Sequence, residues 1–159
     1  MKNTTLVLLL LSCFSCSSIA TTTVAAENIT TATDATNMEL NGFKEAIKHV
    51  HYLAKVTITD VEIISEDDET DKHLYFANVL ATYRGKAHKT ISYEMFVEKG
   101  EESIIGNAPV YIALCKDNQG TYYWPGTGSQ FSSSETINNW LTENVKAVLD
   151  MSTTGNWCD

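Results

Sequence analysis

The feature that most constrains this chain is an alternation of apolar and polar side chains that begins at Val50. In "VHYLAKVTIT", residues 50–59, every second residue is apolar: Val50, Tyr52, Ala54, Val56 and Ile58. Successive side chains of a β-strand point to opposite faces, so this period of two predicts a long strand with one buried face. Further strands are predicted in "LYFANVLATYRG", "KTISYEMFVEKG", "APVYIALC" and "GTYYW". Their mostly short, polar connections favour antiparallel neighbours.

Two helices are expected to flank these strands. In "MELNGFKEAIKHV", apolar residues recur at spacings of three and four, which predicts a short amphipathic helix: Leu40, Phe43, Ile47 and Val50. Near the other end, Ser132 and Glu135 fit a capping box. The apolar face of the helix that follows comprises Ile137, Trp140, Leu141, Val145 and Val148.

These elements predict a mainly β fold: a five-stranded antiparallel OB-type barrel with a short N-terminal helix and a C-terminal helix. The alternative is an α+β, cystatin-like arrangement, in which the first helix lies across an antiparallel sheet. The order of the strands distinguishes the two folds.

The N-terminus has the pattern of a secretion signal. Lys2 is followed by an apolar run and then by small residues that end in "VAA". We therefore expect a signal peptide in residues 1–26, a flexible linker in residues 27–38 and a single globular domain in residues 39–159. The apolar run is too short for a transmembrane helix. Cleavage after Ala26 predicts a secreted or periplasmic protein, whereas "LLSC" resembles a lipobox and would give a membrane-anchored lipoprotein acylated at Cys13.

Charge and cysteine content restrict the partners and the compartment. The formal charge is −9 and becomes −10 when Lys2 is removed, so neither nucleic acid nor an anionic membrane surface is an expected partner. Cleavage after Ala26 leaves Cys115 and Cys158, which are most simply paired as a disulfide in an oxidising compartment. A nucleophilic Cys115 would need a nearby base, and no histidine is marked by the sequence as its partner.

Four stretches together resemble a known family: "HYLAKVTITDVEI", "LYFANVLATYRGK", "ISYEMF" and "GNAPVYIALC". They are similar to the strand series of the netrin-like, OB-type barrel of the tissue inhibitors of metalloproteinases and their bacterial relatives. The similarity spans roughly residues 43–141 and includes the sequence Tyr83-Arg84-Gly85. It implies the barrel but not the inhibition, because those inhibitors begin with a zinc-chelating, disulfide-bonded cysteine that has a free amino group. An N-terminus near Glu27 or at a lipidated Cys13 does not provide that group.

The segment "YYWPG" supplies the candidate binding residues Tyr122, Tyr123 and Trp124. On a strand Tyr122 and Trp124 share one face and Tyr123 takes the other, so at least one ring is expected outside the core. We therefore predict a non-enzymatic binding module without a cofactor, whose partner, a protein or a glycan, contacts the rim at residues 122–128. Core packing of these rings is the structural alternative.

The histidines indicate an alternative function. His49 and His51 are two residues apart, so on a strand both rings would lie on one face and could begin a zinc site. His73, His88 or an acidic residue would supply the third ligand. This alternative is a small extracytoplasmic metal-dependent hydrolase. The acidic run at residues 66–71 lacks the glycine and the distal glutamate of a calcium-binding loop, so we expect a solvated hairpin there.

Overall fold

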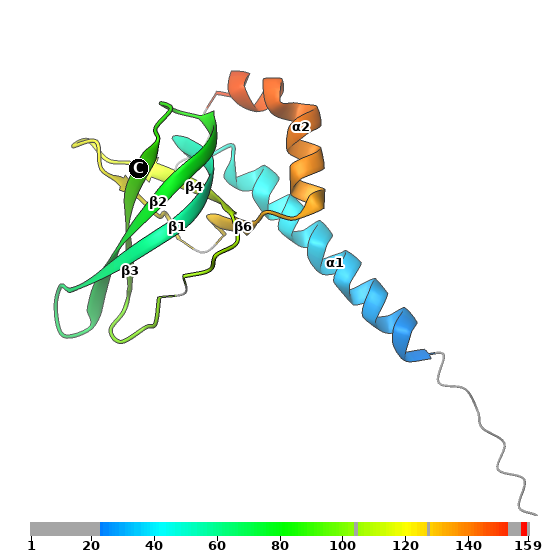
Figure 1. The fold of residues 1–159 in the computed structure, drawn as a ribbon, viewed down its shortest axis with the longest axis horizontal. Helices are drawn as coiled ribbons and strands as arrows, with labels where there is room; N and C mark the ends of the chain where they lie inside the picture. The colour runs from blue at the N-terminus through cyan, green and yellow to red at the C-terminus, as the bar shows by residue number, and fades with distance from the viewer. Residues whose placement is uncertain (1–22, 104, 127, 153–156, 159) are drawn as a thin grey trace, which may run out of the picture.

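The computed structural model describes residues 23–103, 105–126, 128–152 and 157–158, with side chains described from Asp34 onwards. Its elements, shown in Figure 1, are α1 (Thr23–Ala46), β1 (Tyr52–Ser65), β2 (Thr70–Arg84), β3 (Thr90–Glu98), β4 (Val110–Lys116), β5 (Tyr122–Tyr123), β6 (Gln130–Ser132) and α2 (Glu135–Asp150).

Five of the strands form a closed ring in the order β1-β2-β3-β5-β4, because β4 also pairs with β1. β3 and β5 are parallel, with Glu94 opposite Tyr123, and the other neighbours are antiparallel. The barrel is therefore mixed, and the prediction of a purely antiparallel barrel is wrong. The reason is geometric: strand directions cannot alternate all the way around a closed ring of five strands, so at least one pair must be parallel.

Closure of the ring also rules out the cystatin-like alternative. β1 pairs with β4 from Tyr52 opposite Leu114 to Val56 opposite Val110, so the sheet curls back on itself and does not lie open beneath a helix. The additional strand β6 pairs with the first half of β4. Its three residues, "QFS", are too few to show a period of two, and the sequence analysis missed it.

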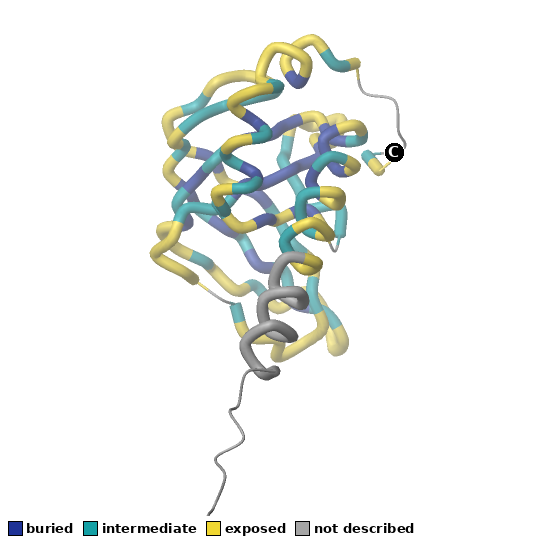
Figure 2. The backbone as a smooth tube through the Cα atoms, turned by 90° about the vertical axis from the view of Figure 1, so that its right-hand side faces the viewer, coloured by how far each residue is buried: buried dark blue, intermediate teal, exposed yellow. Residues whose placement is uncertain are grey.

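Apolar side chains form two cores, one on each side of the barrel wall. The interior core confirms the predicted alternation from Tyr52 to Ile58, whereas Val50, predicted on the same face, precedes β1 and belongs to the outer core. The interior core comprises Tyr52, Ala54, Val56, Ile58, Tyr75, Ala77, Ile91, Tyr93, Ile112 and Leu114. The outer core lies between the wall and the two helices and comprises Phe43, Ala46, Ile47, Val50, Leu53, Tyr111, Ala113, Phe131, Ile137, Leu141 and Val148. Figure 2 shows the buried backbone in the barrel and beneath the helices. Two cores explain why β4 is buried on both faces.

α1 confirms the predicted amphipathic helix but is longer than expected. Phe43 and Ile47 are buried, and Leu40 packs against the same core. The helix ends at Ala46, one turn before the predicted strand residue Val50. Its backbone is also helical across residues 27–38, where the sequence predicts a flexible linker. No glycine or proline interrupts residues 21–41, so nothing in the sequence stops the helix from extending.

α2 is capped by Ser134, whose hydroxyl accepts a hydrogen bond from the Ile137 amide. The predicted cap, Ser132, is wrong because this residue ends β6. Its amide and hydroxyl both donate to the Glu39 carboxylate, at 2.7 and 2.8 Å, and thereby link β6 to α1. Within the predicted apolar face, Ile137, Leu141 and Val148 are buried, Trp140 is half-buried, and Val145 is exposed.

Arg84, the last residue of β2, joins both helices to the barrel. Its guanidinium donates to the carbonyl oxygens of Ile47 and Val50 beside α1, and to those of Val148 and Met151 at the end of α2. Burial lowers the pKa of Arg84, but a guanidinium stays protonated in proteins. One charged side chain thus supplies donors to four carbonyl groups from distant parts of the chain.

Gly85 allows this arrangement, because its φ of +83° disfavours any residue with a Cβ atom. A Cβ at this position would also lie 2.8 Å from Cδ2 of Tyr52. The sequence Tyr83-Arg84-Gly85 therefore has a structural role at the end of β2.

The predicted disulfide between Cys115 and Cys158 is confirmed. It attaches the C-terminal tail to the end of β4, with the two Cα atoms 5.1 Å apart. The helices in the described part of the chain are too short or too polar to cross a bilayer.

We predict that Arg84→Met destabilises the fold by about 3 kcal/mol, because four carbonyl groups lose a charged donor. Urea denaturation followed by tryptophan fluorescence measures the change. Lys86→Met is the matched control, since Lys86 is exposed two residues away. Equal stability of the two variants would contradict the role assigned to Arg84.

Candidate functional site

Tyr122 lies at the end of the barrel that is opposite the β1–β2 hairpin. Its ring packs 4.9 Å from the ring of Tyr52, and its hydroxyl oxygen lies 3.4 Å from Nε2 of His88. The ammonium group of Lys116 lies 5.7 Å from the centre of the Tyr122 ring. The ring is half-buried, so packing fixes its orientation while part of it remains accessible.

A groove of about 310 Å³ runs beside this ring, between the start of β3 and the β4–β5 turn. Its lining comprises His88, Thr90, Ile91, Ser92, Gly120, Thr121 and Tyr122. The turn is held by Asp117, whose carboxylate accepts hydrogen bonds from the amides of Gln119 and Thr121 at 2.9 and 2.8 Å. Gly120 has a φ of +95°, which the turn requires. One groove wall is therefore preorganised by the sequence "KDNQGT".

The structure distributes the three predicted aromatic residues between different surroundings. Tyr122 lines the groove, and Trp124 packs against the interior core. The Trp124 amide donates to the Glu94 carbonyl at 2.8 Å, and its buried indole nitrogen has no hydrogen-bond partner among the described residues. Tyr123 pairs with Cys115 and Glu94 within the sheet. These rings therefore do not form one flat platform, and binding at this rim stays a prediction.

His49 and His51 do not lie together on a strand. His49 is in the turn after α1, where Nε2 lies 2.9 Å from the Glu45 carboxylate and the ring stacks on Trp157. His51 precedes β1, and its Nδ1 accepts a hydrogen bond from the Lys116 amide at 3.1 Å. The predicted geometry fails because the strand starts at Tyr52, after both histidines.

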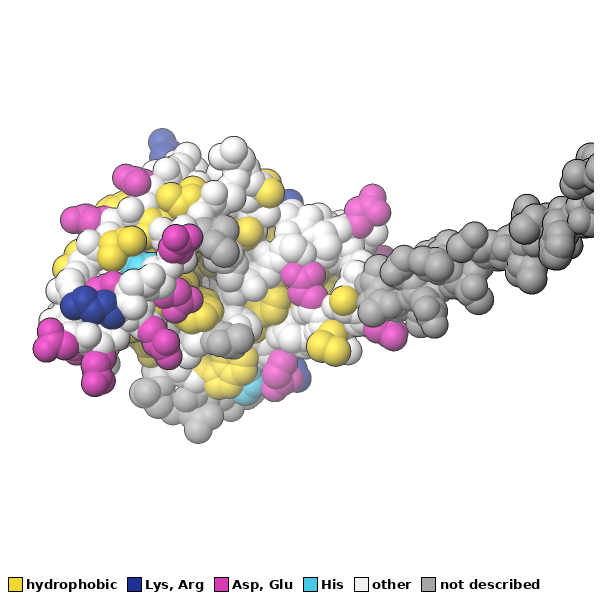
Figure 3. All heavy atoms as spheres, turned by 90° about the horizontal axis from the view of Figure 1, so that it is seen from below, with side chains coloured by type: hydrophobic (Ala, Val, Ile, Leu, Met, Phe, Trp, Pro, Cys, Tyr) yellow, Lys and Arg dark blue, Asp and Glu magenta, His cyan; other side chains and the backbone are white. Residues whose placement is uncertain are grey.

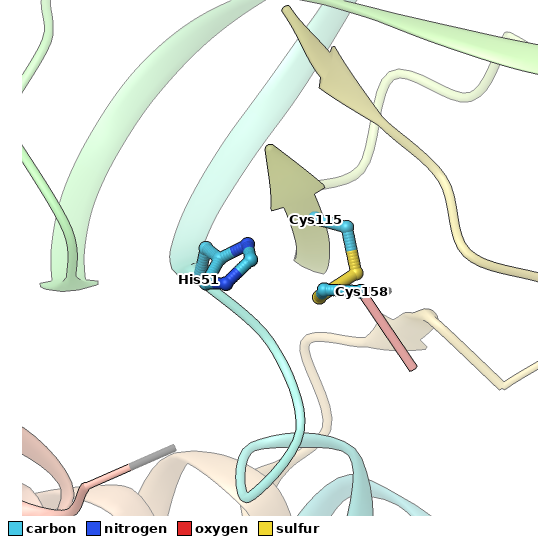
Figure 4. Close-up of side chains that lie close together, drawn as sticks. All are labelled: His51, Cys115 and Cys158. Atoms are coloured by element: carbon cyan, nitrogen blue, oxygen red, sulfur yellow. A yellow bond between two sulfur atoms is a disulfide. The ribbon is translucent and has the colours of Figure 1, made fainter. Parts of the chain in front are cut away.

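Another group of potential metal ligands is present instead. Within the described ranges, the one set of three is His51, Cys115 and Cys158, whose ligand atoms all lie within 4.8 Å of one another. Figure 4 shows the His51 ring beside the disulfide formed by the two cysteines. While that bond is intact, neither sulfur is a thiolate.

Acidic side chains are concentrated at one end of the barrel, where Lys72 and Lys99 also lie. Lys116 lies over the Tyr122 ring, Lys89 is between the lining residues His88 and Thr90 in the chain, and Lys86 precedes His88 by two residues. All three are exposed, and the described residues include no ion-pair partner for any of them. The opposite end carries acidic side chains: Glu66, Asp67, Asp68, Glu69, Asp71, Glu98, Glu101 and Glu102. Figure 3, seen from that side, shows many acidic groups at the surface. The Asp117 carboxylate also lies beside the groove, so it offsets part of the positive charge of these lysines.

The acidic hairpin is confirmed as a connection between β1 and β2. The Asp67 carboxylate accepts hydrogen bonds from the amides of Glu69 and Thr70, and these bonds lower the pKa of Asp67. No set of three acidic side chains in the described residues converges as metal ligands.

Sequence analysis missed a polar feature inside the barrel. β2 begins at Thr70, four residues before the predicted strand, so Asp71, His73 and Tyr75 all point inwards. His73 is 1% exposed, and both of its ring nitrogens lack a hydrogen-bond partner among the described residues. Tyr75 stacks on Tyr93, with ring centres 5.1 Å apart. The period of two continues from Leu74 back to Thr70, and this pattern could have shown that the strand starts earlier.

Comparison of the chain with protein-family models, with curated proteins and with solved structures finds no match. The netrin-like resemblance therefore stays a prediction from the strand pattern, while the five-stranded barrel is a property of the structure.

The buried tyrosines predict a loss of stability at alkaline pH. Burial raises the pKa of Tyr52, Tyr75 and Tyr93 above the ordinary value of 10.0, and partial burial also raises the pKa of Tyr122. Between the pKa of the unfolded chain and the higher pKa of the folded chain, the unfolded tyrosine loses its proton while the folded tyrosine keeps it. The stability of the fold is therefore full below the unfolded pKa and decreases as the pH rises towards the folded pKa. We expect the free energy of unfolding to fall above pH ~10.

Tyr93→Phe tests this prediction, because the hydroxyl of Tyr93 is buried without a partner among the described residues. The variant should be about as stable as the wild type at pH 7 and should lose less stability between pH 10 and 12, by up to about 1.4 kcal/mol per pH unit. Urea denaturation at several pH values measures both. Parallel pH profiles for the two proteins would contradict the prediction.

Proposed function

We propose that the protein is an exported, non-catalytic binding module and that the groove beside Tyr122 binds a glycan. The observation that carries this proposal is the half-buried Tyr122 ring, fixed by Tyr52 and His88 at the wall of an open groove. A fixed, partly exposed ring offers an apolar surface next to a polar hydroxyl.

The topology supports an OB-type barrel. In that fold a five-stranded Greek-key barrel binds oligosaccharides or oligonucleotides on the β2–β3 face and on the loops after β1 and β4. Here the groove uses the start of β3 and the β4–β5 turn. The order of the strands around the barrel is compatible with the resemblance to netrin-like barrels. We propose membership of that group on the basis of the strand pattern in the sequence.

The groove lining favours a glycan over a protein partner. Thr90, Ser92 and Thr121 provide hydroxyl groups along an open, shallow surface. These hydroxyls can exchange hydrogen bonds with sugar hydroxyls, while the Tyr122 ring contacts an apolar sugar face. A protein interface of standard size would instead require about 800 Å² per partner with a more apolar centre.

The unpaired lysines favour a glycan that carries carboxylates. Lys86 and Lys89 flank His88 in the β2–β3 connection, and Lys116 lies over Tyr122. Such exposed charges act over a Debye length of about 8 Å at physiological ionic strength. Three lysines are few for a nucleic acid, whose affinity rests on many phosphate contacts, and the protein as a whole is acidic.

Export is supported by the signal-like leader and by the disulfide, since disulfides persist mainly outside the cytoplasm. The leader lies largely outside the described residues. Mass spectrometry of the mature N-terminus distinguishes cleavage after Ala26 from acylation of Cys13.

The hydrolase alternative has weaker support. His49 contacts Glu45 and Trp157, whereas His51 accepts a hydrogen bond from the Lys116 amide. Metal analysis of protein purified without an affinity tag tests this alternative, and stoichiometric zinc in the oxidised protein would favour it.

We predict that Tyr122→Ala weakens binding of uronic acid oligomers about tenfold, because the stacked ring is lost. Isothermal titration calorimetry measures the dissociation constant. The matched control is Phe96→Ala, since Phe96 is an exposed ring on β3 outside this groove. Unchanged binding by Tyr122→Ala in a folded protein would exclude the groove, and binding to none of the uronic acid or neutral oligomers would exclude the glycan.

We further predict that the double variant Lys86→Gln/Lys89→Gln binds uronic acid oligomers more weakly but leaves binding of matched neutral hexose oligomers unchanged. The wild-type affinity for the acidic oligomers should fall as salt is raised from 50 to 300 mM. Lys146→Gln, an exposed change on α2, is the control. Affinity independent of salt would show that the lysines do not contribute.

A further inference from the structure

The disulfide between Cys115 and Cys158 lies beside a histidine that is held in place by backbone hydrogen bonds. The His51 amide donates to the Leu114 carbonyl at 3.0 Å, and the Lys116 amide donates to Nδ1 of His51 at 3.1 Å. The imidazole is therefore fixed against the end of β4. Its nitrogen and the two sulfurs lie within 4.8 Å of one another, and the histidine is exposed to solvent. Figure 4 shows the three side chains close together.

These three groups are a ligand set when the disulfide is reduced. A dithiol or phosphine reductant supplies two electrons, and with two protons the S–S bond becomes two thiols. Each thiol releases its proton when it binds a metal ion, and the neutral imidazole contributes one lone pair. Two thiolates and one imidazole are typical ligands of Zn²⁺, which would complete its tetrahedral coordination with water.

We propose that the reduced protein binds one thiophilic divalent ion, Zn²⁺ or Co²⁺, through His51, Cys115 and Cys158. The disulfide and the metal ion are then alternative cross-links between the C-terminal tail and the barrel. This proposal is independent of the glycan groove.

The surroundings allow the change from one cross-link to the other. Zn–S bonds of about 2.3 Å in tetrahedral geometry place two sulfurs about 3.8 Å apart, so the sulfurs must move about 1.8 Å further apart than in a disulfide. Cys115 is buried in β4 and cannot move far. Cys158 is in the terminal tail, where Trp157 stacks on His49 with ring centres 4.8 Å apart and keeps the thiol nearby.

Metal binding also has a local consequence at His51. The lone pair of Nδ1 now accepts the Lys116 amide proton. An ion at this nitrogen replaces that proton, and an ion at Nε2 requires the ring proton to move to Nδ1, facing the same amide. In both cases the Lys116 amide loses its partner, which gives a signal that nonspecific binding elsewhere would not produce.

The experiment is a Co²⁺ titration of the full mature chain, oxidised and reduced with a phosphine. We expect the reduced protein to bind one Co²⁺ with thiolate-to-cobalt charge transfer and tetrahedral d–d bands, and the oxidised protein to show neither. The Lys116 amide should shift on addition of diamagnetic Zn²⁺ in a ¹⁵N-resolved NMR spectrum. His51→Ala should weaken Co²⁺ binding at least tenfold, and Cys158→Ser should reduce the charge-transfer intensity.

His88→Ala is the matched control, because His88 lies at the same end of the barrel but outside this ligand set. Absence of charge transfer in the reduced wild type overturns the proposal, as does a His51→Ala variant with unchanged affinity and spectrum. Circular dichroism covers the case in which reduction unfolds the chain. Zn²⁺ should then restore the β spectrum of the wild type, and failure to restore it also overturns the proposal.

Discussion

The hydrogen bonds that β1 makes along both of its edges hold the rest of the molecule in place. From Leu53 to Val56 this strand pairs with β2 on one side and with β4 on the other. Because the ring closes there, Tyr52 and Ala54 face the interior core while Leu53 faces the helices. α1 and α2 bury their apolar faces against this outward side, so the packing of the helices depends on closure of the barrel.

Several links attach the ends of the chain to the barrel. Arg84 binds carbonyl groups beside both helices, Glu39 of α1 binds Ser132 of β6, and the disulfide fixes the tail at Cys115. Tyr122 of the groove lies close to this disulfide, because Tyr123 pairs with Cys115, whereas the acidic hairpin lies at the other end. The fold thus places the disulfide and the groove at one end and the acidic β1–β2 hairpin at the other.

The sequence pattern predicted those features that depend on residues close together in the chain. The alternation after Val50 gave the interior face of β1, and the spacing of Phe43 and Ile47 gave the buried face of α1. The parallel β3–β5 pair could not be predicted in this way, because it follows from closing an odd number of strands. The cap at Ser134 was missed because β6, which pairs with a distant strand, occupies Ser132. Likewise, the division between Tyr122 and Trp124 depends on neighbours supplied by other strands.

The pairing around the ring is uneven. Among the described residues, β3 joins β5 at one residue pair and β5 joins β4 at two, whereas β1 and β2 pair along most of their length. Local opening favours the least protected hydrogen bonds, so among the strands of the barrel amide exchange should be fastest at this narrow seam. The groove spans it, with Thr90 and Ser92 on β3 and Thr121 beside β5. A ligand that contacts both β3 and the β4–β5 turn would stabilise the paired state of these strands and reduce local opening of the barrel.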